Sequence, residues 1–284
     1  MKPIRRKNNV SREISISCTK KIQKQSKSDP KFTDDETSLP INSTKTIDWL
    51  PNDLIVDILA HVATISISDF FNAKLSWKLF NKLAKDNDHY IYNKLSLDEL
   101  SCHPWDLYMS EEATTLFTKC LNSQNSEAMY RLGVTEYLNF HKKKKSGIEL
   151  LEKATNAGHL GASYFMGIIL ICKEEDESDD ETKQSGIRHG IQLLGRVKTS
   201  AQMRECREKL KHIAQKLWLT QNPNFLIPKL FQCQFPNRKR KSWPLLDDYS
   251  HSLCCNTCRF NYEIVYVCNL VVGTSLFSCQ TCQQ

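Results

Sequence analysis

The fold is decided by the stretch Trp49-Leu50-Pro51-Asn52-Asp53-Leu54-Ile55-Val56-Asp57-Ile58-Leu59-Ala60-His61-Val62. Pro51 suits the first position of a helix, because its missing N–H has no partner there and its fixed φ is already helical. Apolar residues then recur at spacings of three and four, which places them on one helical face. They are Leu54, Ile55, Ile58, Leu59 and Val62. The stretch therefore predicts an amphipathic helix that begins at Pro51.

Two further short helices are predicted directly after it. Ser68-Asp69 indicates an N-cap and an acidic first turn for a helix that carries Phe70, Phe71 and Leu75. A third apolar set follows, made of Trp77, Leu79, Phe80 and Leu83. Three short helices in about fifty residues bury little apolar surface, since the buried fraction falls with chain size. We therefore expect a partner to complete this unit.

This block resembles the F-box, the module that attaches substrate adaptors to the Skp-type linker of cullin ubiquitin ligases. The matching residues are Leu50-Pro51, Asp53-Leu54, Ile58-Leu59, Asp69-Phe70 and Leu75-Ser76-Trp77-Lys78. The opening Leu-Pro-x-Asp-Leu is the specific part. The match is loose near Leu75, where the family favours Val-Cys-Lys, and Phe80 stands in for the aromatic that follows. The alternative is an ordinary amphipathic helix after a proline.

The resemblance implies which side chains would contact the linker. They are Leu50, Pro51, Leu54, Ile58, Leu59, Phe70, Leu75 and Trp77. It also implies that the chain recruits a target protein without catalysing a reaction itself.

Composition is that of a soluble globular protein, with 40% hydrophobic and 25% charged residues in 284. The first thirty residues contain no apolar run of the kind that would indicate a signal peptide. The apolar tract 262–277 is too short and too interrupted for a membrane span. Of the twelve cysteines, six crowd between Cys254 and Cys282. Without a secretory signal this crowd indicates a metal site rather than disulfides, and a nuclear and/or cytoplasmic protein.

The formal charge of +7 is unevenly distributed. Residues 1–46 are basic and polar with few large apolar side chains, so we expect them to be disordered. Residues 221–250 are interpreted as a linker that contains the basic cluster Arg238-Lys239-Arg240-Lys241. This cluster fits a nuclear localisation signal, a phosphate-contacting patch or a plain solvated linker.

Between these parts the chain is helical and repetitive. Ala128-Met129-Tyr130-Arg131-Leu132-Gly133 and Ala162-Ser163-Tyr164-Phe165-Met166-Gly167 share Ala, Tyr and Gly at an offset of 34 residues (162 − 128). That period is typical of tetratricopeptide helix–turn–helix repeats, whose helices pack closely where side chains are small. Gly158 is expected to end the helix between the two copies in a left-handed conformation.

The same residues resemble the Sel-type variant of the tetratricopeptide repeat. One copy is clear, and a second, degraded copy begins near Gly190-Ile191-Gln192-Leu193-Leu194. A helix over about 203–218 is expected to cap the stack. The resemblance implies a partner-binding scaffold, and the alternative is a helical bundle with chance periodicity. An F-box, a short Sel-type array and a Cys-rich tail together resemble a plant F-box family.

The tail contains two CxxC pairs, Cys255/Cys258 and Cys279/Cys282, separated by 20 residues (279 − 258 − 1). Four thiolates at this spacing predict a closed, structural zinc site. Tyr262–Val267 and Leu270–Phe277 are rich in β-branched and aromatic residues and predict a β-hairpin that brings the pairs together. His251, Cys254 or Cys268 are alternative ligands. A thioredoxin-type motif is excluded because no βαβ pattern surrounds the cysteines.

The sequence contains no motif for catalysis. A phosphate-binding glycine loop, HExxH and Gly-x-Ser-x-Gly are all absent. We therefore expect a non-enzymatic, mainly α protein with a trihelical F-box at 47–97, a tetratricopeptide-like array at 110–220 and a hairpin-containing, zinc-ribbon-like tail at 251–284.

The predicted function is that of a substrate-recruiting adaptor in an SCF-type cullin–RING ubiquitin ligase. Its partners would be the Skp-type linker, the cullin core and an unknown protein substrate, with no membrane. The main alternative is a zinc-dependent nucleic-acid-binding protein that uses the basic cluster and aromatic residues such as Trp243, Tyr249 and Phe260. A plain helical scaffold with no ubiquitin role is a third interpretation.

Overall fold

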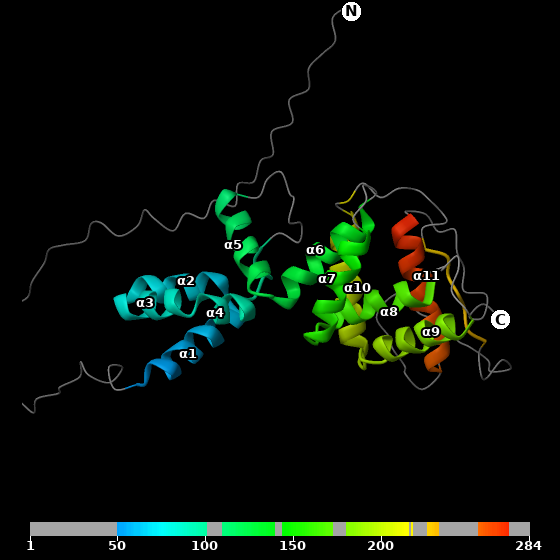
Figure 1. Ribbon diagram of the computed structural model, residues 1–284, viewed down its shortest axis with the longest axis horizontal. Coiled ribbons are helices and arrows are strands. Elements are labelled where there is room, and N and C mark those ends of the chain that lie inside the picture. Colours follow the sequence, from blue (N-terminus) through cyan, green and yellow to red (C-terminus); the bar gives the residue numbers. More distant parts are fainter. Residues whose placement is uncertain are drawn as a thin grey trace, which may run out of the picture. The chain divides into compact units, whose positions relative to one another are not determined.

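The computed structural model describes residues 50–100, 110–139, 144–172, 180–215, 217, 226–232 and 255–272. All regular elements of these ranges are α-helices (Figure 1). They are α1 (Asn52–Ile65), α2 (Ile67–Ser76), α3 (Lys78–Asp86), α4 (Asp88–Lys94), α5 (Glu111–Asn122), α6 (Ser126–Leu138), α7 (Lys144–Asn156), α8 (Leu160–Cys172), α9 (Asp180–Leu194), α10 (Ser200–Gln215) and α11 (Asn256–Val272). The predicted mainly α fold is confirmed. The predicted N-terminal segment and the basic cluster lie outside the described residues.

The predicted amphipathic helix is present as α1, but it begins at Asn52, one residue later than predicted, because Pro51 is the N-cap residue. The carbonyl of Pro51 accepts the N–H groups of Leu54 and Ile55. Its buried face consists of Ile55, Val56, Leu59, Ala60 and Ala63. This face packs with Phe70 of α2, Leu83 of α3 and Ile91 of α4 into the first of two hydrophobic cores.

Helix α2 differs from the prediction at its start. Ser66, not Ser68, is the N-cap, and its hydroxyl accepts the N–H of Asp69 at 3.1 Å. Ser68 lies inside the helix and donates its hydroxyl to Glu99 at 2.7 Å. A fourth helix, α4, also follows the three predicted ones, because Ile91 and Tyr92 add buried apolar surface to the same core.

The array of helices α5 to α10 contains two pairs that touch through glycines. A Cβ on Gly147 of α7 would lie 2.9 Å from the carbonyl oxygen of Gly133 in α6. In the next pair, a Cβ on Gly190 of α9 would lie 2.7 Å from the carbonyl oxygen of Gly167 in α8. Gly133 and Gly167, which lie 34 residues apart, therefore occupy equivalent positions in two similar helix crossings, α6 with α7 and α8 with α9.

The glycine after α7 also agrees with the prediction. Gly158 has a φ of 86°, and the N–H of the following His159 returns to the carbonyl of Ala154. The left-handed backbone turns the chain into α8 without the strain that a Cβ would add there.

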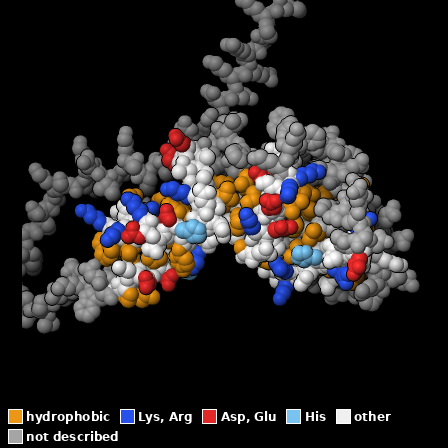
Figure 2. Space-filling model, viewed as in Figure 1, with side chains coloured by type: hydrophobic (Ala, Val, Ile, Leu, Met, Phe, Trp, Pro, Cys, Tyr) orange, Lys and Arg blue, Asp and Glu red, His pale blue; other side chains and the backbone are white. Residues whose placement is uncertain are grey.

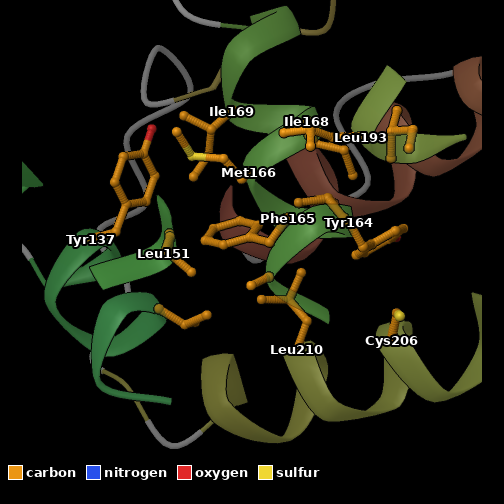
Figure 3. Packing of buried hydrophobic residues seen from close by; sticks show 14 of the residues in the cluster. Tyr137, Leu151, Tyr164, Phe165, Met166, Ile168, Ile169, Leu193, Cys206 and Leu210 are labelled. Atoms are coloured by element: carbon orange, nitrogen blue, oxygen red, sulfur yellow. The ribbon is translucent and has the colours of Figure 1, made fainter. Parts of the chain in front are cut away.

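Helix α8 lies at the centre of the second hydrophobic core and is buried almost over its whole length. Its Phe165 meets Tyr137 of α6 edge to face, with ring centroids 5.6 Å apart. Figure 3 shows Phe165 among Tyr137, Leu151 and Leu210, which come from three other helices. A helix apolar on all sides is typical of such a central position.

The hairpin predicted for the tail is wrong in its described part, because residues 256–272 form helix α11. Phe260, Ile264, Val267 and Val271 recur at spacings of three and four and enter the core formed with α8 and α10. This helical periodicity outweighs the β preference of the individual residues, since β preference depends strongly on context. No helix of the described residues is long and apolar enough to cross a membrane.

Candidate functional site

The surface of α1 carries an exposed apolar face. Leu50, just before the helix, is 36% exposed, Leu54 is 48% exposed and Ile58 is 50% exposed. Leu54 and Ile58 are four residues apart and therefore lie on the same side of the helix, and Leu50 directly precedes its N-cap residue, Pro51. We call these three residues the α1 face. Figure 2 shows hydrophobic side chains gathered on the part of the surface that α1 to α3 form.

The α1 face stays exposed because the opposite side of the helix is the one that is buried in the first hydrophobic core. Ile55 and Leu59, each one position after an exposed residue, are 2% and 1% exposed. One step along a helix turns the side chain by about 100°. Neighbouring residues in the pairs Leu54-Ile55 and Ile58-Leu59 therefore divide between solvent and core.

Two of the predicted linker-contacting residues are placed elsewhere by the structure. Leu59 and Phe70 are both 1% exposed and belong to the core of α1 to α4. In the free chain their apolar side chains hold together the helices that present the α1 face, and their contact with the linker stays a prediction.

The other predicted contacts lie at the surface. Pro51 is exposed next to the α1 face. Leu75, at the end of α2, is 81% exposed. Trp77 is half-buried between α2 and α3, with its ring 4.9 Å from that of Phe80. Leu75 therefore offers a second apolar contact, whereas Trp77 mainly packs on its own module.

One further exposed apolar residue of α1 is not among the predicted contacts. Ile65 is 68% exposed and lies seven positions after Ile58, which returns it to the same side of the helix. The seven-residue spacing from Ile58 is the sequence signal that identifies Ile65 as part of this side of the helix. Ile65 extends the α1 face toward the end of the helix.

Two buried polar side chains join the first four helices to the array. The Nδ2 group of Asn125 donates to the carbonyls of Tyr92, Asn93 and Leu95 at 2.9–3.0 Å. Its Oδ1 caps α6 by accepting the N–H of Ala128.

Arg131 adds to this junction from the next turn of α6. Its guanidinium donates to the carbonyl of Leu97 at 3.0 Å and to that of Leu100 at 3.2 Å. Because both side chains bind backbone carbonyls, they hold residues 92–100 against the start of the array.

A buried ionic cluster links three helices of the array. Glu127 of α6 lies 2.7 Å from Arg131, 2.8 Å from His159 and 3.4 Å from Lys209 of α10. Burial raises the pKa of Glu127, but the His159 hydrogen bond and the charges of Arg131 and Lys209 outweigh it and hold the pKa well below its usual range. The cluster stabilises the packing of α6, α8 and α10.

His159 is fixed in orientation by a second bond. Its Nδ1 accepts the N–H of Ala162 at 3.0 Å, so Nε2 is the nitrogen that donates to Glu127. The imidazole ring also stacks on Tyr130 at 4.6 Å. His159 therefore serves as the N-terminal cap of α8.

Glu263 of α11 is a second buried carboxyl group. It accepts the hydroxyl of Tyr164 at 2.9 Å and lies 3.4 Å from Arg207. Burial raises its pKa to about 7, against the opposing effects of Arg207 and Tyr164. Its complete burial ties α11 to α8 and α10 and leaves no access for a substrate.

Of the four predicted zinc ligands, two are in the described residues. Cys255 directly precedes α11, and Cys258 lies in its first turn and is buried. Cys279 and Cys282 lie outside the described ranges, within which no group of three or more metal-binding side chains occurs. Among the alternative ligands, Cys268 is buried beside Cys172, with their sulfur atoms 3.9 Å apart.

Helix α11 sets a geometric condition for this zinc site. Between Cys258 and Val272 the helix carries the chain about 20 Å away. The seven residues from Gly273 to Cys279 reach at most about 25 Å when fully extended. A four-cysteine site therefore requires residues 273–279 to lead back along α11 toward its start.

Comparisons with known proteins agree with the two resemblances. Residues 98–215 match the family model described as plant tetratrico peptide repeats. The chain is 29% identical over 178 residues to a provisionally named F-box protein of Arabidopsis thaliana, covering 62% of this chain and 56% of that protein. It is also 29% identical over 138 residues to another F-box protein of that plant, covering 46% of this chain and 77% of the relative.

The chain thus spans little more than half the length of the first of these relatives. No solved structure matches it. The resemblance to plant F-box proteins with helical repeats is confirmed, and nothing in the comparisons supports the nucleic-acid-binding alternative.

Proposed function

We propose that this chain is a non-catalytic, substrate-recruiting adaptor of an SCF-type cullin–RING ubiquitin ligase. The observation that carries the proposal is the α1 face, in which Leu50, Leu54 and Ile58 are between 36% and 50% exposed on a helix whose other side is buried. A row of exposed large apolar side chains is typical of a protein-binding surface. The F-box names of the two relatives supply the partner class, a Skp-type linker joined to a cullin.

The α1 face supplies apolar contact area for such a linker. Fully burying one Leu or Ile side chain contributes about 2 kcal/mol, so covering three half-exposed ones contributes about 1 kcal/mol each. Leu75 of α2 and Ile65 of α1, at 81% and 68% exposure, would add further apolar contact area. Docking would therefore depend on apolar contact and respond weakly to salt.

The helical array fits the role of holding a target protein. The junction at Asn125 and Arg131 fastens it to the module that carries the α1 face. A fixed connection favours ubiquitin transfer by holding the target near the conjugating enzyme, since proximity alone can accelerate a reaction strongly. The proposal places the protein in the nucleus and/or cytoplasm, where these ligases act.

The first experiment is co-expression with a Skp-type linker followed by size-exclusion chromatography. We expect a one-to-one complex for the wild type and loss of the complex for Leu54→Asp and Ile58→Asp, because each variant places an unpaired charge in the contact. Thr118→Asp, on the exposed side of α5, is the matched control and should bind normally.

Circular dichroism of each variant checks that the helices are retained, which is expected because the substituted side chains are half-exposed. Normal binding by both α1 variants would show that the linker docks elsewhere. Failure of the wild type to bind would reject the adaptor function.

A structural zinc ion bound by Cys255, Cys258, Cys279 and Cys282 remains part of the proposal on the grounds of cysteine spacing. Elemental analysis of the purified chain should give one zinc per molecule, and Cys279→Ser together with Cys282→Ser should remove it. A metal-free wild type purified without chelators would reject the site.

A further inference from the structure

The segment 226–232, Leu-Ile-Pro-Lys-Leu-Phe-Gln, lies against α11 without belonging to any helix (Figure 1, gold). Its contact with α11 is made by Asn261, which is completely buried. Asn261 Oδ1 accepts the N–H of Phe231 at 2.9 Å, and Asn261 Nδ2 donates to the carbonyl of the same residue at 2.8 Å. We call this segment the strap.

The two bonds of Asn261 define the kind of backbone that it recognises. In an extended chain the N–H and C=O of one residue point to the same side, whereas in a helix they point in opposite directions. A single carboxamide can therefore bind both groups only of an extended residue. These bonds involve no atom of the Phe231 side chain, so any residue except proline, which lacks the N–H, can make them at this position.

Side chains anchor the strap at two further points. Leu226 is 2% exposed and belongs to the core formed by α8, α10 and α11. Phe231 packs partly buried against the same core, whereas Leu230 is 38% exposed. The anchors are thus one aliphatic and one aromatic side chain, five positions apart.

The strap also contacts the end of α8. The pKa of Cys172 is lowered by its hydrogen bond with Cys268 and, after the opposing effect of burial, by the backbone N–H of Lys229. This contact again uses the main chain of the strap. The strap therefore lies against α8 and α11, at a site that contacts mainly its backbone and two apolar side chains. We call this the strap site.

The connection that contains the strap is long enough to release it. Forty residues separate Gln215, the end of α10, from Asn256, the start of α11 (256 − 215 − 1). Ten residues precede the strap after Gln215 (225 − 215) and 23 follow it before Asn256 (255 − 232). This chain length allows the strap to leave its site while α10 and α11 stay in place.

We propose that the strap site around Asn261 is a peptide-binding site, occupied by the strap until an extended segment of a target protein replaces it. Such a segment carries an aliphatic and an aromatic residue five positions apart. Recognition through main-chain bonds with two side-chain anchors is a recurring mode of peptide binding. The inference deepens the proposed function, on which it rests for the role of the bound peptide as a ubiquitination target.

The test uses the full chain and a fluorescein-labelled peptide with the sequence of residues 224–234, followed by fluorescence anisotropy. The wild type should bind it weakly, because the tethered strap competes at a high effective concentration. The variant Leu226→Ser/Phe231→Ser, whose own strap is weakened, should bind the peptide at least tenfold more tightly. Adding Asn261→Ala to that variant should reverse the gain.

Two controls make the result specific. A peptide with serine at both anchor positions should bind none of the variants. Linker binding through the α1 face should be the same in all of them, so a failure of the adaptor function and a failure of this inference are seen separately. A folded strap variant that does not bind the peptide would overturn the inference.

Hydrogen exchange of the wild type decides the question if the strap variant does not fold. The Phe231 amide should exchange at least a hundredfold faster than amides in the middle of α8, because the strap opens while the core stays closed. Equal protection of the two would mean that the strap leaves only when the protein unfolds, and would overturn the inference.

Discussion

Glu127 and Glu263 are both buried carboxyl groups, but their surroundings shift their pKa values in opposite directions. Glu127 has a histidine and two cations within 3.4 Å, and these outweigh its burial. Glu263 has one arginine at 3.4 Å, and burial has the larger effect, so its pKa rises to about 7. The number of hydrogen-bond donors and cations that the fold brings to each carboxylate decides whether its pKa is lowered or raised.

The raised pKa of Glu263 predicts how stability depends on pH. Between its ordinary value of 4.5 and about 7 the folded state binds more protons than the unfolded state. The free energy of unfolding should therefore fall as pH rises through this window, by at most about 3 kcal/mol. Urea denaturation of wild type and Glu263→Gln at pH 5 and pH 8 measures the effect.

The Glu263→Gln variant should lose this part of the pH dependence, because a carboxamide does not titrate. Glu152→Gln, at an exposed position of α7, should keep it. An unchanged pH dependence in Glu263→Gln would assign the effect to another group.

The Glu127 cluster predicts a loss of stability on substitution. Glu127→Gln leaves Arg131, whose side chain is 2% exposed, without its carboxylate. Breaking a buried ion pair in this way costs about 3 kcal/mol. Urea denaturation at pH 7 should show this loss, whereas Glu205→Gln, whose residue is 63% exposed and pairs with Lys209, should cost less than about 1 kcal/mol.

Acidification should lower the stabilising contribution of Glu127, whereas it raises that of Glu263. The lowered pKa of Glu127 means that its stabilising contribution is present above its ordinary value of 4.5 and is lost as pH falls below it. The difference between wild type and Glu127→Gln should therefore shrink at pH 3. A constant difference would contradict the assigned charge state.

At the scale of the elements, the helix pairs depend on glycines at their crossings. A Cβ on Gly147 would lie 2.6 Å from the backbone nitrogen of Tyr137, and backbone atoms cannot move aside easily. Gly186 of α9, in contrast, has nothing within 4 Å of the position of a Cβ. The chain therefore offers a matched pair of helical glycines.

These two glycines predict opposite effects of the same substitution. Gly147→Ala should destabilise the protein by about 2 kcal/mol through overpacking. Gly186→Ala should stabilise it by up to about 1 kcal/mol, because alanine favours the helix. Thermal unfolding of both variants measures the signs, and equal effects would mean that the α6–α7 crossing is not close.

The elements also separate what could be predicted from what could not. The 34-residue offset found the α6–α7 and α8–α9 crossings, because small residues are required wherever two backbones meet. Helix α11 differs from the predicted strands, because the three- and four-residue spacing of its apolar residues outweighs the β preference of its β-branched and aromatic side chains. Helix α4 was missed because seven residues give too short a pattern.

At the scale of the whole molecule, the junction between the first four helices and the array is held by side chains that gave no sequence signal. Asn125 is 3% exposed and binds three carbonyls besides capping α6. The first hydrophobic core also includes Phe117 and Leu132 of the array. Both features couple the module of the α1 face to the helices behind it.

The coupling predicts how the molecule responds when the junction is cut. Asn125→Ala should cost about 2–3 kcal/mol, from a lost cap and unpaired buried carbonyls. Hydrogen exchange should become faster in α1 to α4 while α8 stays protected. Asn122→Ala, at an exposed position of α5, is the control and should change neither. A uniform loss of protection would contradict a local junction.

The sequence by itself determined the elements whose patterns are local. The start of α1, the left-handed Gly158 and the glycine crossings follow from rules about single turns and contacts between neighbouring helices. Leu54 and Ile58 of the candidate site were named by the resemblance to the F-box, because the helical period by itself grouped them with Ile55 and Leu59 on one face.

The tertiary structure alone decided which of the paired apolar residues face solvent and which face the core. Leu54 and Ile55, or Ile58 and Leu59, are equally apolar, and only the position of α2 to α4 distinguishes them. The clamp of Asn261 on Phe231, 30 residues away, likewise depends on packing between distant segments. Such contacts are selected by the burial of the whole core, and no short stretch of sequence contains that information.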